Sequence, residues 1–294
     1  MKYSAKDIEK IIFKYIPTAK GYQAKVMEAM EYAVNAGGKR LRPMMMQMCH
    51  DMYDDRDDEA LHVFMAAIEM IHTYSLIHDD LPALDNDDLR RGKPTVHVKF
   101  GEDIAILAGD GLLNYAYETA AKAFTIRPAD SAVEQAYIYL ASKPGIYGMI
   151  GGQTLDVMKS GKQLSDAELE YIYINKTSAL IECAMMVGAV LGGADKEELL
   201  LIEQAARAVG IAFQVKDDIL DIVGDEALLG KPVNSDEKNK KTTYVTLHGM
   251  EKSAAYVEEL SENAVRLIDS LSVKNEDVKR ELIWLVKKLI DRDK

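Results

Sequence analysis

Apolar residues recur at spacings of three and four along most of this chain, as in helices that bury one face. Between residues 59 and 77, Leu61, Phe64, Ile68 and Ile71 follow this spacing and predict an amphipathic helix. Sustained period-two alternation, the mark of half-buried strands, is absent from the sequence. The pattern therefore predicts an all-α fold, with further helices at 4–15, 20–35, 43–53, 103–123, 130–142, 146–159, 251–271 and 275–291.

Two other helices carry start and stop signals. Ser165 and Glu168 form a capping-box pattern ahead of a long periodic stretch, and the glycine pair at 192–193 would end it. Another stretch begins near Asp195 and ends at Gly224. The turn-rich segments between helices are expected at 37–43, 85–94, 127–130 and 224–241.

The composition is that of a globular protein with a sizeable core. The chain has 294 residues, 48% hydrophobic and 29% charged, and we expect a single domain over residues 1–294. A formal net charge of −12 argues against nucleic-acid binding, which needs a surplus of Lys and Arg. Basic residues must therefore serve local sites.

The two cysteines and the lack of a long apolar stretch indicate a cytoplasmic protein. Cys49 and Cys183 each lie in an apolar stretch, so we interpret them as buried, reduced thiols. Residues 1–17 are rich in charge and lack the apolar run of a signal peptide. Because no stretch of about 18 apolar residues is unbroken, we expect no membrane span.

Two aspartate clusters are the strongest chemical signal in the sequence. On a helix, Gln214, Asp217, Asp218 and Asp221 share one face, where the acids would repel one another unless neutralised. Clustered carboxylates without matching His or Cys ligands suit Mg²⁺, which takes one or two carboxylates plus substrate phosphate oxygens. This interpretation implies a diphosphate substrate.

The first cluster, HDDLPALD at 78–85, has a different geometry. Asp79 and Asp85 do not share a helical face, and Pro82 would clash with the carbonyl of His78 if the helix continued. We therefore expect the chain to bend and bring Asp85 back. A merely solvated acidic face would not be embedded in apolar helices, as both clusters are.

Basic residues that could bind diphosphates flank the first cluster. Lys39, Arg40 and Arg42 follow two glycines, and Arg90, Arg91 and Lys93 surround another. Arginine offers a planar fork of donors to phosphate oxygens, whereas lysine supplies a compact charge. His72 lies seven residues before Asp79 on the same helical face, where it could contact a bound diphosphate or simply fill the core. Further lysine candidates are Lys176, Lys231 and Lys241.

In combination and order, the motifs resemble those of the trans-isoprenyl diphosphate synthases, especially the bacterial farnesyl diphosphate synthases. The resemblance covers nearly the whole chain. Its elements are GGKRLRP at 37–43, HTYSLIHDDLPALDNDDLRRGKPTVH at 72–97, GGQTLD at 151–156, KTSAL at 176–180, FQVKDDILD at 213–221 and KKTTY at 240–244.

The resemblance implies an isoprenoid synthase fold, a bundle of ten or more mostly antiparallel helices around a central cavity, and a homodimer. The reaction would be a magnesium-dependent head-to-tail condensation of isopentenyl diphosphate with an allylic diphosphate, dimethylallyl or geranyl. Three Mg²⁺ ions would bind the allylic diphosphate through Asp79, Asp80, Asp85, Asp217 and Asp221.

The family pattern also suggests roles for the basic and polar residues. Arg90, Lys176, Lys231 and Lys241 would assist at the allylic diphosphate, and Lys39, Arg42, His72 and Arg91 would bind isopentenyl diphosphate. Carbonyl oxygens near Lys176 and Thr177, together with the side chain of Gln214, would stabilise the allylic carbocation with their dipoles. No protein nucleophile is needed, since the released diphosphate can accept the proton.

Product length is expected to be fifteen carbons. Tyr74 stands five positions before Asp79, where a bulky side chain could form the floor of the cavity, and Ser75 beside it is small. Departures from the family pattern are Thr73, where alanine is frequent, Asn86, where an acid is frequent, and the individual sequence at 232–240.

Other activities explain less of the sequence. Geranylgeranyl or geranyl diphosphate synthesis would use the same residues. A class I terpene cyclase has a second metal site of mixed residue types and would leave Lys39, Arg42 and Arg91 idle. A metal phosphohydrolase using His62, His72 and His78 leaves the second cluster unexplained, and a non-catalytic regulatory subunit would be expected to lose aspartates.

Overall fold

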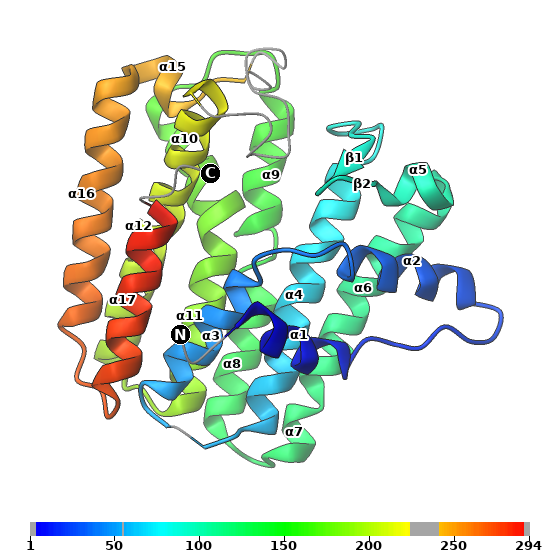
Figure 1. Ribbon diagram of the computed structural model, residues 1–294, viewed down its shortest axis with the longest axis horizontal. Coiled ribbons are helices and arrows are strands. Elements are labelled where there is room, and N and C mark those ends of the chain that lie inside the picture. The colour runs from blue at the N-terminus through cyan, green and yellow to red at the C-terminus, as the bar shows by residue number, and fades with distance from the viewer. Residues whose placement is uncertain (1–3, 55, 224–240, 291–294) are drawn as a thin grey trace. The chain divides into compact units, whose positions relative to one another are not determined.

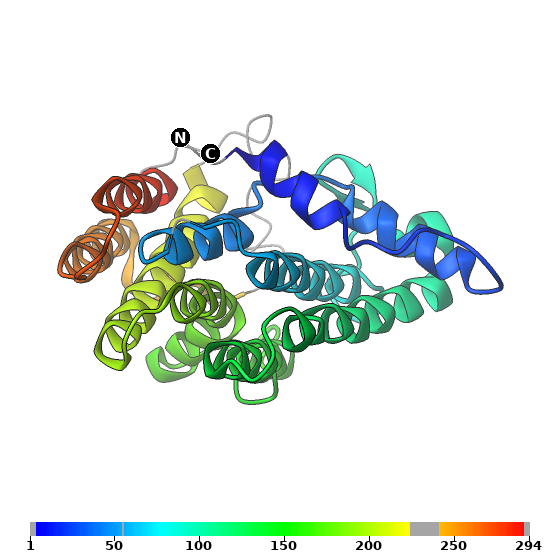
Figure 2. The same cartoon turned by 90° about the horizontal axis from the view of Figure 1, so that it is seen from below.

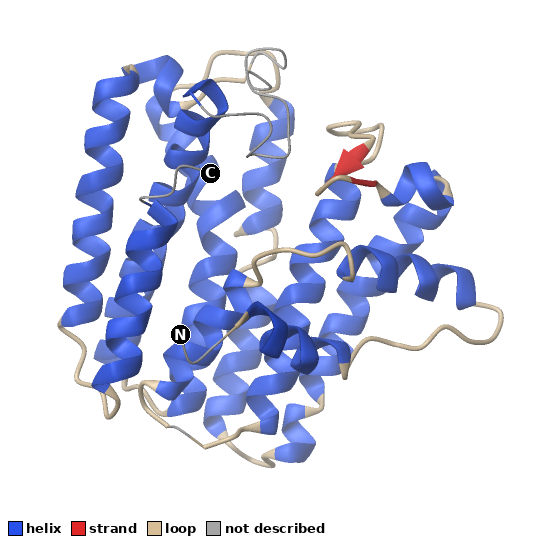
Figure 3. Cartoon of the chain, in the orientation of Figure 1, coloured by secondary structure: helices blue, strands red, loops and turns tan. Residues whose placement is uncertain are grey.

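The computed structural model describes residues 4–54, 56–223 and 241–290. The regular elements among these residues are helices, apart from one two-stranded hairpin, which confirms the all-α prediction (Figures 1 and 3). By internal contacts the chain forms two compact units, Met1–Gln47 with Asp57–Tyr137 (unit 1) and Met48–Arg56 with Ile138–Lys294 (unit 2). The expected single domain and central cavity stay predictions.

Unit 1 is built around one apolar helix, α4 (Glu59–Asp79), which packs against its neighbours α1, α2, α6 and α7. Phe64, Met65 and Ile68 are among its fully buried side chains. An antiparallel hairpin, β1 with β2, follows α4. The bounds of the other elements are α1 Ala5–Phe13, α2 Ala24–Val34, β1 Leu89–Arg90, β2 Lys93–Pro94, α5 Val96–Phe100, α6 Glu102–Ala121 and α7 Ala123–Ile126.

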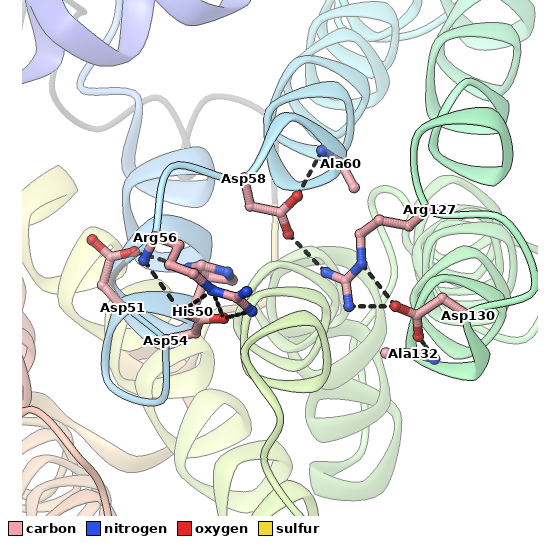
Figure 4. Close-up of polar contacts among 9 residues, drawn as sticks. All are labelled: His50, Asp51, Asp54, Arg56, Asp58, Ala60, Arg127, Asp130 and Ala132. Carbon is pink, nitrogen blue, oxygen red and sulfur yellow. Dashed lines mark hydrogen bonds and ion pairs between the residues drawn. The ribbon is translucent and has the colours of Figure 1, made fainter.

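The first turn of α4 is anchored by an ion pair (Figure 4). Asp58 caps the helix, accepting a hydrogen bond of 2.9 Å from the backbone N–H of Ala60. Arg127 donates to Asp58 at 2.8 Å and to Asp130 at 2.7 Å, and Asp130 accepts from the N–H of Ala132. One arginine thus joins two capping carboxylates from distant parts of the sequence.

Unit 2 is organised by α12 (Lys196–Val223), a helix of 28 residues that packs against α11 and α16. Helices α16 and α17 lie side by side in both views (Figures 1 and 2). The remaining elements are α9 Met149–Met158, α10 Asp166–Ile172, η1 Tyr173–Ser178, α11 Ala179–Gly192, α15 Tyr244–His248, α16 Met250–Asp269 and α17 Glu276–Ile290. Two boundaries between the units fall inside α3 (Leu41–Asp51) and α8 (Ser131–Ser142), and the third lies between Arg56 and Asp57, just before α4.

The predicted helix signals are confirmed in unit 2. Ser165 and Glu168 form both hydrogen bonds of a capping box at the start of α10. Gly193 ends α11 in the left-handed region with φ of 100°, which costs glycine little. The long stretch from 165 to 192 is nevertheless not one α-helix, because a π-helical turn, η1, separates α10 from α11.

Two segments, Glu59–Asp79 and Asp166–Gly192, are long and apolar enough to cross a membrane. In each, 78% of the apolar window is buried inside the protein, so both are interpreted as core helices. Cys49 and Cys183 are buried and free, as predicted, and burial raises the pKa of both thiols.

Candidate active site

The first aspartate motif lies where α4 ends. The helix stops at Asp79, and the backbone N–H of Asp85 donates to the carbonyl of Asp79 at 2.9 Å. The N–H of Asp87 reaches the carbonyl of Asp80 at 3.2 Å. The predicted bend around Pro82 is therefore confirmed, because the chain turns back and brings the backbone of Asp85 against Asp79.

The second acid of this motif holds an arginine. Asp80 is only 3% exposed, and Arg90 Nε lies 2.7 and 2.9 Å from its two carboxylate oxygens. Burial acts to lower the pKa of Arg90, but the hydrogen bond to Asp80 and the charges of Asp80, Asp87 and Asp79 together raise it. The forked pair fixes the guanidinium of Arg90 beside the motif.

The two basic loops of the sequence meet in unit 1. Arg91 and Gly92 form the turn of the β1–β2 hairpin with φ of 53° and 73°, as a type I′ turn requires. Arg91 Nη1 donates to the carbonyl of Gly37. Gly38 has a φ of 139°, which L side chains rarely adopt, and a Cβ atom there would lie 2.8 Å from the same Nη1, so glycine favours this approach. The hairpin thus delivers Arg91 to the segment that carries Lys39 and Arg42.

His72 lies in a strongly cationic environment. Burial, and then the charges of Arg42, Arg91, Arg90 and Arg40, hold the pKa of His72 well below its usual value, so the imidazole is neutral. Burial also lowers the pKa of Arg42 to about 10, which leaves it charged at neutral pH. Among the described residues, the buried Nε of Arg42 has no hydrogen-bond partner. An N–H donor of this kind, in a cluster of cations, is suited to binding an anion.

Arg40 has a different role from its neighbour Arg42. It is 3% exposed and donates to Glu69 at 2.6 Å, to Glu9 at 3.1 Å and to the carbonyl of Val34 at 2.6 Å. Its charge is therefore neutralised inside the protein. Lys39, by contrast, is exposed.

Tyr74, the predicted floor residue, is buried on α4 and is 6% exposed. Its ring packs edge-on to His78 with centroids 5.8 Å apart. Burial, followed by the effects of Tyr117 and Asp79, raises the pKa of Tyr74 to about 12. Ser75 donates to the carbonyl of His72 at 3.0 Å, so its side chain is turned back onto its own helix.

The second aspartate motif lies on α12 in unit 2. Asp218 and Asp221 are buried, at 4% and 1% exposure, and Asp217 is partly exposed. Gln214, one turn earlier, accepts a hydrogen bond of 2.8 Å from the hydroxyl of Thr177 and donates to Asp218 at 3.2 Å. Two of the predicted catalytic side chains, Thr177 and Gln214, are thus in direct contact.

A cavity of about 100 Å³ in unit 2 collects several of the predicted residues. Its lining includes Lys176, Thr177 and Gln214 together with Lys241. Lys176 forms an ion pair of 2.6 Å with Asp156, which also lines the cavity. Lys231 lies outside the described residues.

The GGQTLD motif at 151–156 brings α9 close to η1. A Cβ atom on Gly152 would lie 2.3 Å from the backbone nitrogen of Lys176, so glycine lets α9 pass against η1. Asp156 of the same motif then meets Lys176. Tyr173 was missed, and Asp218 was predicted on the acidic face without a role of its own; no local sequence signal marks their contact, which spans 45 residues.

The donor set fits magnesium rather than a softer metal. Within the described residues, no group of three or more His, Cys, Asp or Glu side chains forms a ready cation site. Mg²⁺ is usually bound by one or two carboxylates, with water and substrate phosphate oxygens completing an octahedron. Oxygen-only motifs that each offer a few carboxylates are compatible with that mode of binding.

Comparison with known proteins gives a consistent result. The family model described as polyprenyl synthetase matches residues 23–282. The chain is 43% identical to farnesyl diphosphate synthase of Geobacillus stearothermophilus over 89% of each chain. It is 42% identical to geranylgeranyl diphosphate synthase of Cyanophora paradoxa, over 89% of this chain and 87% of that one.

One similar solved structure contains bound ligands. Geranyltransferase from Helicobacter pylori, complexed with magnesium and isoprenyl diphosphate, superposes with a TM-score of 0.85 at 29% identity, covering 98% of this chain and 95% of that one. The family is magnesium-dependent. On the evidence of the family model and of relatives that match along most of their length, this chain belongs to the polyprenyl synthetase family and is a prenyltransferase.

Proposed function

We propose that this prenyltransferase joins isopentenyl diphosphate to an allylic diphosphate, dimethylallyl or geranyl, and releases farnesyl diphosphate as its final product. The observation that carries the proposal is the cationic environment of His72, where the buried Nε of Arg42 finds no acceptor among residues 4–54, 56–223 and 241–290. A second diphosphate pocket is needed to join two diphosphates but not to cyclise one. Lys39, Arg42, His72 and Arg91 would form that pocket for isopentenyl diphosphate.

The allylic diphosphate would be bound through magnesium at Asp79 and Asp85 of the first motif and Asp217 and Asp221 of the second, with three ions in all. Asp80 was predicted to take part, and its contact with Arg90 supports at least an indirect role. Arg90, Lys176, Lys231 and Lys241 would add positive charge around the leaving group. Bound magnesium supplies Lewis-acid stabilisation of the departing diphosphate.

The protein residues would then control the carbocation. The allylic C–O bond breaks with its electron pair on the diphosphate, the double bond of isopentenyl diphosphate forms the new C–C bond, and the released diphosphate accepts the proton. The oxygen of Gln214 and the Thr177 hydroxyl, which are hydrogen-bonded to each other, would present dipoles to the cation. Lys176, paired with Asp156 in the structure, would exchange that partner for the diphosphate.

Tyr74 supports a fifteen-carbon product. Its ring is buried on α4, one to two turns before Asp79, as expected for a floor that stops chain growth. Geranylgeranyl diphosphate synthesis is the second candidate, because relatives with that activity are as similar as the farnesyl synthases. The two differ only in how far the chain can extend.

Product analysis tests both proposals. The purified protein is supplied with dimethylallyl and isopentenyl diphosphates and Mg²⁺, and the dephosphorylated products are identified by mass spectrometry. Farnesol is expected from the wild type, and longer alcohols from Tyr74→Ala. Tyr22→Ala, which changes a fully exposed ring, is the control and should leave the product unchanged. A twenty-carbon product from the wild type would favour the second candidate.

A homodimer and a cytoplasmic location complete the proposal. Val98, Ile106 and Leu107 on α5 and α6 are 47–52% exposed, and a dimer interface would cover such side chains. Light scattering on the purified protein would test whether it is a dimer. The Leu107→Glu variant is expected to be monomeric. A wild-type protein that is monomeric at micromolar concentration would reject the dimer.

A further inference from the structure

We propose that Asp218, together with Tyr173, is a positioning device: it orients the amide of Gln214 and fastens the segment that carries Lys241 to α12. This inference rests on the proposed role of Gln214 in prenyl transfer. It assigns to the second acid of the α12 motif a task different from metal binding, and it adds Tyr173 to the residues that shape the reaction.

Asp218 is surrounded by protein hydrogen-bond donors. It is 4% exposed and accepts from the hydroxyl of Tyr173, from Nε2 of Gln214 at 3.2 Å and from the backbone N–H of Tyr244 at 3.2 Å. The N–H of Tyr244 also lies 2.9 Å from the Tyr173 hydroxyl oxygen. Three elements, η1, α12 and α15, therefore meet at one carboxylate.

The carboxylate decides which way the Gln214 amide faces. A carboxylate only accepts hydrogen bonds, so Gln214 must offer its NH₂ group to Asp218. Its oxygen is then turned to the other side, where it accepts the Thr177 hydroxyl at 2.8 Å. The negative end of the amide dipole is thereby fixed on the side of the cavity lined by Lys176 and Thr177, where a cation would need it.

Tyr173 holds the π-helical turn that carries Lys176 and Thr177. It is the first residue of η1, and Ser178, the last, donates to the Tyr173 carbonyl at 3.1 Å. A Cβ atom on Gly210 would lie 2.3 Å from Ser178 Oγ, so α12 supports this end by close contact. The Tyr173 hydroxyl provides the second attachment to α12, through Asp218. An inserted π-turn of this kind commonly marks a functional site.

The same contact fixes the end of a segment that lines the cavity. Tyr244 is the first residue of α15, and Lys241 to Thr243, which precede it, line the cavity with Gln214. Because its N–H binds Asp218 and Tyr173, the backbone after Lys241 is tied to α12. Loss of the Tyr173 hydroxyl would loosen both the Gln214 amide and this segment.

The test is a double-mutant cycle with Tyr173→Phe and Gln214→Ala, measured as prenyl transfer with Mg²⁺. Tyr173→Phe keeps the ring and removes only the hydroxyl, and it is expected to lower kcat roughly tenfold to a hundredfold. If Tyr173 acts through Gln214, the same change in the Gln214→Ala background should lower kcat much less. Tyr171→Phe, at an exposed ring two residues earlier, is the matched control.

Two further readouts separate positioning from other roles. The Mg²⁺ concentration for half-maximal rate and the KM for isopentenyl diphosphate should stay within about twofold of wild type, since neither ligand is proposed to contact Tyr173 or Asp218. Asp218→Asn should behave like Tyr173→Phe; if it does not fold, as judged by thermal melting, Tyr173→Phe alone decides. Unchanged kcat in Tyr173→Phe would overturn the inference, and equal losses in both backgrounds would overturn its central claim that Tyr173 acts through Gln214. An inactive wild-type protein would instead reject the proposed function.

Discussion

The two aspartate motifs look alike in sequence but are built differently. The first stands at the end of α4 and folds back on itself, so that Asp85 returns to Asp79 through a backbone hydrogen bond. The second lies along the uninterrupted helix α12. The two motifs therefore differ in backbone geometry although their sequences are similar, because Pro82 bends the first motif and the second has no proline.

One feature is nevertheless common to both motifs. In each adjacent pair of acids, the second is buried and bound by protein donors: Asp80 by the guanidinium of Arg90, Asp218 by Tyr173, Gln214 and the backbone of Tyr244. The first acids, Asp79 and Asp217, are partly exposed. The comparison suggests a division of labour, in which the first acid binds metal and the second positions another catalytic or binding group.

The largest expected effect comes from the first acids. Asp79→Asn and Asp217→Asn should each lower kcat by about a thousandfold, since loss of a metal ligand removes several kcal/mol of leaving-group stabilisation. The Mg²⁺ concentration for half-maximal rate should rise as well. Asp88→Asn, at an exposed acid near the first motif, is the control. The division of labour would be rejected if Asp80→Asn or Asp218→Asn raised the Mg²⁺ requirement as much as these variants.

A smaller effect is expected when the second acid of the first motif is changed. Asp80→Asn leaves the partly buried guanidinium of Arg90 without its carboxylate, and should lower the free energy of unfolding by about 2 kcal/mol in urea denaturation. Asp87→Asn is the matched control: its carboxylate lies 3.7 Å from Arg90 and is 53% exposed, so the loss should be under about 0.5 kcal/mol. Equal losses would show that Asp80 does not position Arg90.

The smallest expected effect is a pH dependence of stability at His72. Because the pKa of His72 is depressed in the folded protein, the unfolded chain takes up this proton first as pH falls below 6.5. The free energy of unfolding should then fall by up to about 1.4 kcal/mol per pH unit until the folded pKa is reached. Urea denaturation at pH 7.5 and 5.5 should show a larger loss for wild type than for His72→Gln. Identical losses would mean that burial and the surrounding arginines do not hold His72 neutral.

The sequence could predict the helices because local signals define them. Periodicity identified α4, α6, α12, α16 and α17 to within a few residues, and the capping box of α10 and the glycine after α11 lie where expected. The short helices α5, α7 and α15 were not predicted, because four or five residues carry too little periodicity. The π-turn η1 was missed because one inserted residue hardly changes an otherwise apolar pattern.

The sequence predicted which residues belong to the candidate site, but not which of them form hydrogen bonds or ion pairs with one another. Arg40 and Arg42 stand two positions apart in one motif, and only the tertiary contact with Glu69 separates the internally paired arginine from the other. Likewise, Asp217 and Asp218 are indistinguishable until α12 is packed against η1, where Asp218 meets Tyr173. Long-range hydrogen bonds of this kind leave no trace in local sequence.

The most direct test of the account is the metal dependence of prenyl transfer by the purified protein. Dimethylallyl and isopentenyl diphosphates are supplied, and release of inorganic diphosphate is followed with Mg²⁺, after EDTA, and after excess Mg²⁺ is restored. The account predicts turnover with Mg²⁺, none with the chelator and recovery on restoration. Turnover that persists undiminished in EDTA would contradict it, because the aspartate motifs would then have no metal through which to act.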